Sequence, residues 1–125
     1  MSCNPSIGGV GRGTLIREID AMGGLIGKIA DRAGIQFKVL NKSKGPAVYG
    51  PRAQIDRDLY AREMQKELTS SPLNEKLNIY LGSVKNLIIE EGRCQGIRLE
   101  SGEVLRSEKV VITTGTFLGG KCYIG

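Results

Sequence analysis

The spacing of apolar residues changes near Leu77, and that change limits the fold to one that combines helices with strands. Between Leu15 and Ala33 apolar residues recur at gaps of three and four, which is the spacing of one helical face. After Leu77, short runs rich in β-branched residues alternate with Glu-Gly and Ser-Gly turns. This pattern predicts strands near 77–82, 85–90, 94–99 and 103–106. The fold class is therefore α/β or α+β.

The helical stretch has a weak point at Gly23, Gly24 and Gly27, because a glycine inside a helix costs up to about 1 kcal/mol relative to alanine. We expect the helix to begin at Gly13 or Thr14 and either to break at these glycines or to pack closely against them. Gly34 is the predicted helix end.

Three further segments follow before the region of strands. Residues 35–41 alternate apolar and polar side chains and predict a short strand. The Gly- and Pro-rich residues 42–54 predict a loop. Asp56 is placed to cap a second helix, over residues 57–68.

The last apolar run, Val110 to Thr113, is continuous and leads to Gly115. A buried parallel strand has this composition, and a glycine at its carboxyl end lets a ligand approach the backbone. A nucleotide-binding α/β domain opens with a buried strand that feeds a glycine turn, and no such strand precedes the first helix. We therefore expect residues 1–125 to be part of a single domain whose first strand is missing.

Composition excludes several classes of protein. No apolar run approaches the roughly 20 residues of a membrane span. The chain has no histidine and only three separated cysteines, which argues against a zinc site and against Ser-His-Asp or Cys-His catalysis. The odd number of cysteines indicates a reducing compartment. A net charge of +5 is compatible with a phosphate-rich partner.

The glycine-rich loop over residues 8–13 has the order G-x-x-G-x-G, so it matches neither the dinucleotide fingerprint nor the P-loop. Its amides, the helix start that follows and Arg12 could together bind an anion. A turn selected for tight packing explains the pattern equally well. A few residues earlier, Cys3 would be a reactive thiolate in this positive environment, although a lone cysteine is more often a small buried hydrophobe.

A second candidate site is the basic segment that holds Lys42, Lys44 and Arg52 beside Tyr49. Cations on a stiff loop next to an aromatic ring suit contacts with phosphate or nucleic acid. A solvated surface loop is the alternative, and composition slightly favours it.

Three long stretches, residues 1–25, 33–60 and 110–125, closely resemble the MnmG/GidA family of flavoproteins, which modify the wobble uridine of tRNA. The resemblance implies an α/β fold: a partial FAD-binding Rossmann-like domain of the glutathione-reductase type, with an antiparallel β-meander and its first strand missing. It also implies that the full protein is an enzyme that adds an aminomethyl-type group to carbon 5 of the uridine, whereas this segment alone would be inactive. The alternatives are a non-catalytic RNA-binding or scaffold fragment and a generic FAD-dependent oxidoreductase.

The resemblance further implies FAD as cofactor, with NADH and methylene-tetrahydrofolate as co-substrates. The implied partners are tRNA, an MnmE-type GTPase and, for the full-length protein, a second copy in a homodimer. The form of the segment "VYGPRAQIDR" favours a mitochondrial protein over one from the bacterial cytoplasm.

Roles for individual residues follow from the same resemblance. Cys3 matches the family's catalytic thiol, and Val84 matches a position whose backbone meets the adenine end of FAD. Two departures are Arg12, where the bacterial family usually has lysine, and Tyr123, where it usually has histidine. The remaining cofactor positions are Gly8, Gly9, Gly11, Gly13, Thr114 and Gly115. The positions on the substrate and tRNA side are Arg12, Lys44, Arg52 and Gln54.

Overall fold

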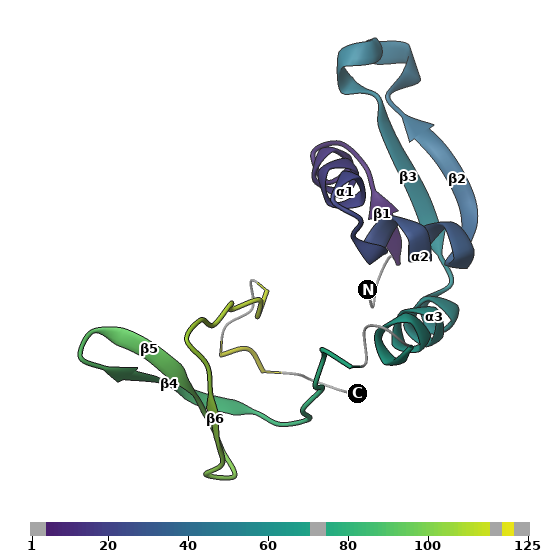
Figure 1. Ribbon diagram of the computed structural model, residues 1–125. Helices are drawn as coiled ribbons and strands as arrows, with labels where there is room; N and C mark the ends of the chain where they lie inside the picture. Colours follow the sequence, from purple (N-terminus) through teal and green to yellow (C-terminus); the bar gives the residue numbers. More distant parts are fainter. Residues whose placement is uncertain (1–4, 71–74, 116–118, 122–125) are drawn as a thin grey trace. The chain divides into compact units, whose positions relative to one another are not determined.

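The computed structural model describes residues 5–70, 75–115 and 119–121, and these divide into two compact units, Met1–Asn78 and Ile79–Gly125. The first unit holds a three-stranded antiparallel sheet in the order β1-β3-β2 (Figure 1). Among the described residues, no helix is long and apolar enough to cross a membrane. The elements of the first unit are β1 (Ser6–Gly8), α1 (Arg12–Ala21), α2 (Leu25–Ala33), β2 (Gly34–Leu40), the 3₁₀ turns η1 (Lys42–Lys44) and η2 (Pro46–Val48), β3 (Gly50–Ile55) and α3 (Arg57–Thr69).

The predicted first helix is broken at its glycines, as one of the two expectations stated. α1 ends at Ala21 and α2 begins at Leu25, with Gly24 as the residue that precedes its first turn. A Cβ on Gly24 would lie 2.9 Å from the carbonyl oxygen of Ile19, so only glycine fits at this corner. α1 begins one residue before the predicted start, and Gly34 follows directly after the last residue of α2.

The prediction for residues 42–54 is wrong in its second half, because Gly50–Ile55 form the central strand β3. Ala53 and Ile55 are buried, while Arg52 and Gln54, which alternate with them, are half-buried, so the segment has the alternation of a strand. The sequence predicts a loop here because Gly50 and Pro51 are both typical loop residues. The short strand β1, of three residues, carries too little pattern to be predicted.

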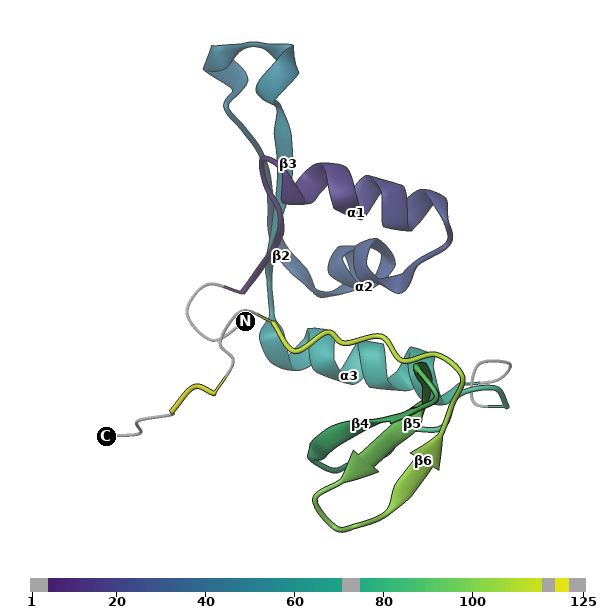
Figure 2. The same ribbon diagram turned by 90° about the vertical axis from the view of Figure 1, so that its left-hand side faces the viewer.

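One face of this sheet is covered by α1 and α2, which lie on the same side of the strands (Figure 2). The core cluster joins Ala30 and Ala33 of α2 to Ala53 and Ile55 of β3. Ile7, Leu59 and Tyr60 pack against it. Partial burial raises the pKa of the Tyr60 phenol above its ordinary value.

α3 begins where the sequence predicts. The Asp56 carboxylate accepts a hydrogen bond from the Leu59 backbone N–H at 2.9 Å, and the helix runs one residue beyond the predicted end. Two half-buried carboxylates of α3 form ion pairs with Arg32 of α2: Glu63, at 3.6 Å, and Glu67. The pKa of Arg32 is raised by its hydrogen bond to Glu67.

Replacing Asp56 with alanine is expected to lower the local stability of α3 by about 1 kcal/mol, the usual cost of losing an N-cap. Amide hydrogen exchange of the first turn of α3 measures the effect. Asp56→Ser is the matched control, since a hydroxyl oxygen can accept the same bond. Equal losses in the two variants would contradict a capping role for Asp56.

The second unit is an antiparallel meander of β4 (Val84–Glu90), β5 (Arg93–Leu99) and β6 (Val104–Arg106), in that order. These strands agree within one residue with three of the predicted runs. Glu91 and Gly92 between β4 and β5 both have positive φ, as a two-residue type I′ hairpin requires. The predicted Glu-Gly turn is thus confirmed.

Two other predicted strands, 77–82 and Val110–Thr113, are wrong for the described structure, because their residues take part in no strand pairing there. A strand forms only where a neighbouring strand satisfies its backbone N–H and C=O groups. Val111 and Ile112 are 85% and 64% exposed, so their apolar side chains lack the burial that their composition predicts.

Candidate functional site

The glycine-rich loop joins β1 to α1 and packs backbone against backbone on the start of β3. The Gly9 N–H donates to the carbonyl of Pro51 at 2.8 Å. Gly8 has φ +98°, and a Cβ there would lie 3.2 Å from Cα of Arg52 and closer still to the Pro51 carbonyl oxygen. A Cβ on Gly50 would in turn lie 2.9 Å from the backbone nitrogen of Val10. Glycine is therefore required on both sides of this contact.

Several amides of the loop already have partners within it. The Arg12 N–H donates to the carbonyl of Val10 at 3.0 Å, and the Gly13 N–H donates to that of Gly9 at 2.8 Å. The sequence left open whether the loop binds an anion or is selected for tight packing. These hydrogen bonds and close approaches show the tight packing directly. Gly11 differs from its neighbours, because its φ is +77° and a Cβ there would meet no atom within 4 Å. A ligand could therefore approach the backbone at Gly11 without meeting a side chain.

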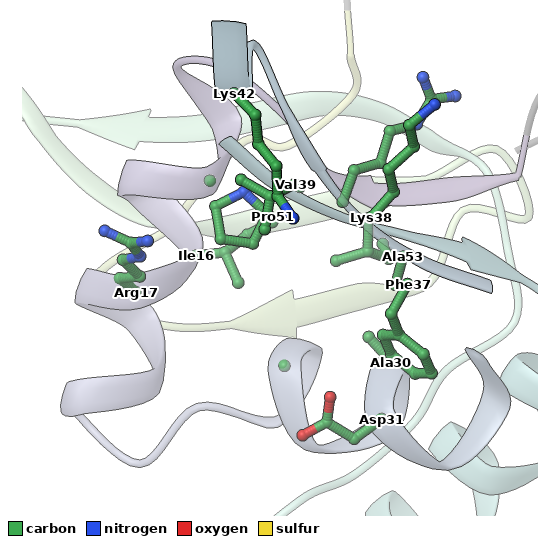
Figure 3. A pocket seen from close by; sticks show the side chains of 15 residues that line it. Ile16, Arg17, Ala30, Asp31, Phe37, Lys38, Val39, Lys42, Pro51 and Ala53 are labelled. Carbon is green, nitrogen blue, oxygen red and sulfur yellow. The ribbon is translucent and has the colours of Figure 1, made fainter. Parts of the chain in front are cut away.

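A cavity of about 500 Å³ lies between the sheet and the helices α1 and α2 (Figure 3). Its volume is within the range of small-molecule sites. Small and apolar residues form most of its wall. Its charged lining residues are Arg17, Asp31, Lys38, Lys42 and Arg52, of which Lys38 and Arg52 also line a hollow described below. Gly8 and Gly13 of the glycine-rich loop also line this cavity, so the loop and the cavity form one candidate site.

The glycine-rich loop also meets the segment that the sequence marked as a separate basic site. A smaller cavity of about 60 Å³ lies between residues of the loop and residues 47–51. In the sheet, Gly8 is the register partner of Arg52 and Ser6 is that of Gln54. The structure therefore brings Arg52 and Gln54 beside the predicted cofactor glycines.

Arg52 and Gln54 share a third hollow, of about 240 Å³, with Gln36, Lys38 and Leu40 of β2. Sequence reasoning did not select Gln36 and Lys38. The alternation of apolar and polar residues in β2 could have identified them, because it places both on the face opposite to Phe37. By contrast, the predicted Lys44 is exposed in η1 and lines none of these three cavities of the described structure.

Arg12 is exposed at the start of α1 and likewise lines none of the three described cavities. Val84, at the start of β4, is 54% exposed and belongs to the second unit. Thr114 and Gly115 are also exposed there, and Gly115 has φ +76°. These positions keep their roles as predictions.

The predicted thiol, Cys3, lies outside the described residues, as does Tyr123. Cys94 is the free cysteine of the described part, half-buried in β5 with its Sγ 3.9 Å from the carbonyl oxygen of Gly96. Within residues 5–70, 75–115 and 119–121, no three His, Cys, Asp or Glu side chains cluster as metal ligands would.

A helix-covered antiparallel sheet with a glycine-rich loop, and an antiparallel meander in the second unit, define a segment of a mixed helix–strand domain. The family model described as glucose inhibited division protein A matches residues 1–125, and the chain belongs to this family. The predicted resemblance to MnmG/GidA is thereby confirmed.

Curated relatives include mitochondrial and bacterial proteins. The chain is 50% identical to the mitochondrial 5-taurinomethyluridine-tRNA synthase subunit MTO1 of Mus musculus, over 100% of the chain and 19% of that protein. It is also 50% identical to the tRNA uridine 5-carboxymethylaminomethyl modification enzyme MnmG of Caldicellulosiruptor saccharolyticus, over 100% of the chain and 20% of that protein. The chain thus spans about a fifth of the length of these relatives, and their equal identity assigns no compartment.

Solved structures of the family also match this chain. Aquifex aeolicus GidA in one crystal form superposes with a TM-score of 0.82 at 45% identity, covering 94% of this chain and 19% of that one. A second crystal form gives a TM-score of 0.79 at 46% identity. The predicted fold class, a partial Rossmann-like domain with antiparallel strands, is confirmed by this match.

Proposed function

We propose that this chain is part of an FAD-dependent enzyme that adds an aminomethyl-type group to carbon 5 of the wobble uridine of tRNA. The observation that carries the proposal is the match along the whole chain, at 50% identity, to relatives named for tRNA uridine modification. The reaction requires the rest of a protein of family length, so the 125-residue chain alone is expected to be inactive. Residues 1–125 would together contribute part of one FAD-binding domain.

The cofactor assigned to the glycine-rich loop is FAD. Gly11 supports this assignment, because its open backbone and the start of α1 beside it suit a phosphate or a flavin edge. Gly8, Gly9 and Gly13 hold the loop against β3 and so fix the position of that backbone. FAD would supply the redox chemistry, with NADH as the reductant and methylene-tetrahydrofolate as the one-carbon donor. Val84, Thr114 and Gly115 are proposed as the cofactor positions of the second unit.

The substrate side of the site is assigned to Arg12, Lys44, Arg52 and Gln54. Arg52 and Gln54 lie on the polar face of β3, next to the glycine-rich loop in the register of the sheet. Arg12 and Lys44 are exposed cations at two other points of the same unit. Cations of this kind contact phosphates of tRNA. An MnmE-type GTPase, a second copy of the protein and a mitochondrial location complete the proposal.

The test uses the protein encoded by the complete reading frame. We expect it to purify with bound flavin and to restore the carbon-5 modification in tRNA from cells that lack the endogenous enzyme, as measured by nucleoside mass spectrometry. Restoration is expected to need the GTPase partner. Salt-sensitive tRNA binding without flavin or modification would instead support the non-catalytic RNA-binding alternative. Flavin reduction without any effect on tRNA would support a generic oxidoreductase.

A further inference from the structure

The face of the sheet opposite to α1 and α2 carries a compact set of polar side chains. In the register of β2 and β3, Lys38 is the partner of Arg52 and Gln36 is the partner of Gln54. Opposed residues of an antiparallel pair project from the same face. Figure 3 shows Lys38 extending from β2 in the direction opposite to Phe37, which extends toward Ala30 of α2.

The charges on this polar face are unbalanced. Two like charges directly opposite each other on neighbouring strands destabilise a sheet. Among the residues that the structure describes, the ion pairs are formed by Arg32, Arg57 and Arg106, so neither Lys38 nor Arg52 has an acidic partner there. An anion placed between the two side chains would remove the repulsion and gain two charge-assisted hydrogen bonds.

The shape of the polar face leaves room for such an anion. Its hollow has a volume of about 240 Å³, with Gln36, Lys38, Arg52 and Gln54 around it and the apolar Leu40 at one side. Arg52 and Gln54 are half-buried, whereas Lys38 and Gln36 are exposed, so the β3 side of the hollow is less accessible to solvent than the β2 side.

We infer that the polar face binds a phosphate group between Lys38 and Arg52, with the amides of Gln36 and Gln54 placed to hydrogen-bond the attached ribose. An arginine fork and a lysine ammonium are both donors that recognise phosphate, and a glutamine amide both donates and accepts. The inference rests on the proposed function, from which it takes two sources of phosphate: the backbone of tRNA and the diphosphate of FAD. It adds Lys38 and Gln36 to the candidate binding residues of the first unit.

Lys38→Gln in the protein from the complete reading frame is the main test, because it removes one charge from an exposed position. If the phosphate belongs to tRNA, the variant is expected to keep its flavin and to bind tRNA several-fold more weakly. The slope of log affinity against log salt should fall in magnitude by about 0.7–0.9, the value for one lost phosphate contact. If the phosphate belongs to FAD, the variant is expected to lose flavin while the salt slope stays unchanged.

Two further variants control for charge and for folding. Lys66→Gln removes the same charge from an exposed position of α3, away from the polar face, and is expected to change neither readout. Lys38→Arg keeps the charge and is expected to restore whichever readout Lys38→Gln changes. A Lys38→Gln protein that matches Lys66→Gln in flavin content, affinity and salt slope would overturn the inference. The proposed function would survive that result, since it depends on flavin and modification in the unaltered protein.

Discussion

Gly8→Ala is expected to disrupt the packing of β1 on β3 and to displace the glycine-rich loop. Alanine at φ +98° is strained by about 1–3 kcal/mol. Its Cβ would also lie 3.1 Å from the Pro51 carbonyl carbon and 3.2 Å from Cα of Arg52, so backbone atoms rather than a flexible side chain must move. We expect a total loss of about 3 kcal/mol or more in the stability of the first unit, together with loss of flavin. Hydrogen exchange of peptides from β1 and β3 measures the first effect, and flavin absorbance measures the second.

Gly11→Ala separates the two causes. Gly11 also has a positive φ, +77°, but a Cβ there would meet no atom within 4 Å. The substitution is therefore expected to cost only the backbone strain, about 1–2 kcal/mol. If both variants lost the same stability, close packing against Pro51 would not be the reason for glycine at position 8.

The parts of the fold that the sequence predicts correctly depend on local chemistry. Asp56 can cap α3 whatever surrounds the helix, because donor and acceptor are three residues apart. Glu91 and Gly92 similarly form a hairpin turn through their own backbone preferences. β3 was missed because Pro51 suggests a loop, and its acceptance in a strand depends on the partners that β1 and β2 supply. Long-range pairing of this kind is not encoded in a short window of sequence.

The candidate site shows the same division. The glycine-rich loop was recognised from its composition, but its role in packing on β3 requires the distance between Gly9 and Pro51. Arg52 and Gln54 were selected through a family resemblance, whereas Lys38 and Gln36, their register partners, were not. The strands β2 and β3, which η1 and η2 connect, bring these four residues together. Only the register of the two strands shows which residues are paired.

Cys3→Ser is expected to lower the rate of tRNA modification by at least about 10³-fold in the protein from the complete reading frame, if Cys3 is the proposed nucleophile. A thiolate that adds to the uridine ring next to carbon 5 moves an electron pair toward the ring carbonyl, and carbon 5 then becomes the nucleophile. A serine hydroxyl is almost entirely un-ionised at neutral pH, so it cannot replace the thiolate in this step. Flavin content and tRNA affinity should remain unchanged, because the substitution removes chemistry rather than binding.

Cys94→Ser is the matched control for this experiment. Cys94 is half-buried in β5, and its one described polar contact is the weak one to the carbonyl of Gly96, at 3.9 Å. Serine can make the same contact, so the modification rate is expected to stay within about twofold of the unaltered protein. Full activity of Cys3→Ser would assign Cys3 a structural role only. A loss of flavin in Cys3→Ser, with activity lost in proportion, would instead place Cys3 in the binding of the cofactor, because a nucleophile acts on tRNA after the flavin is already bound.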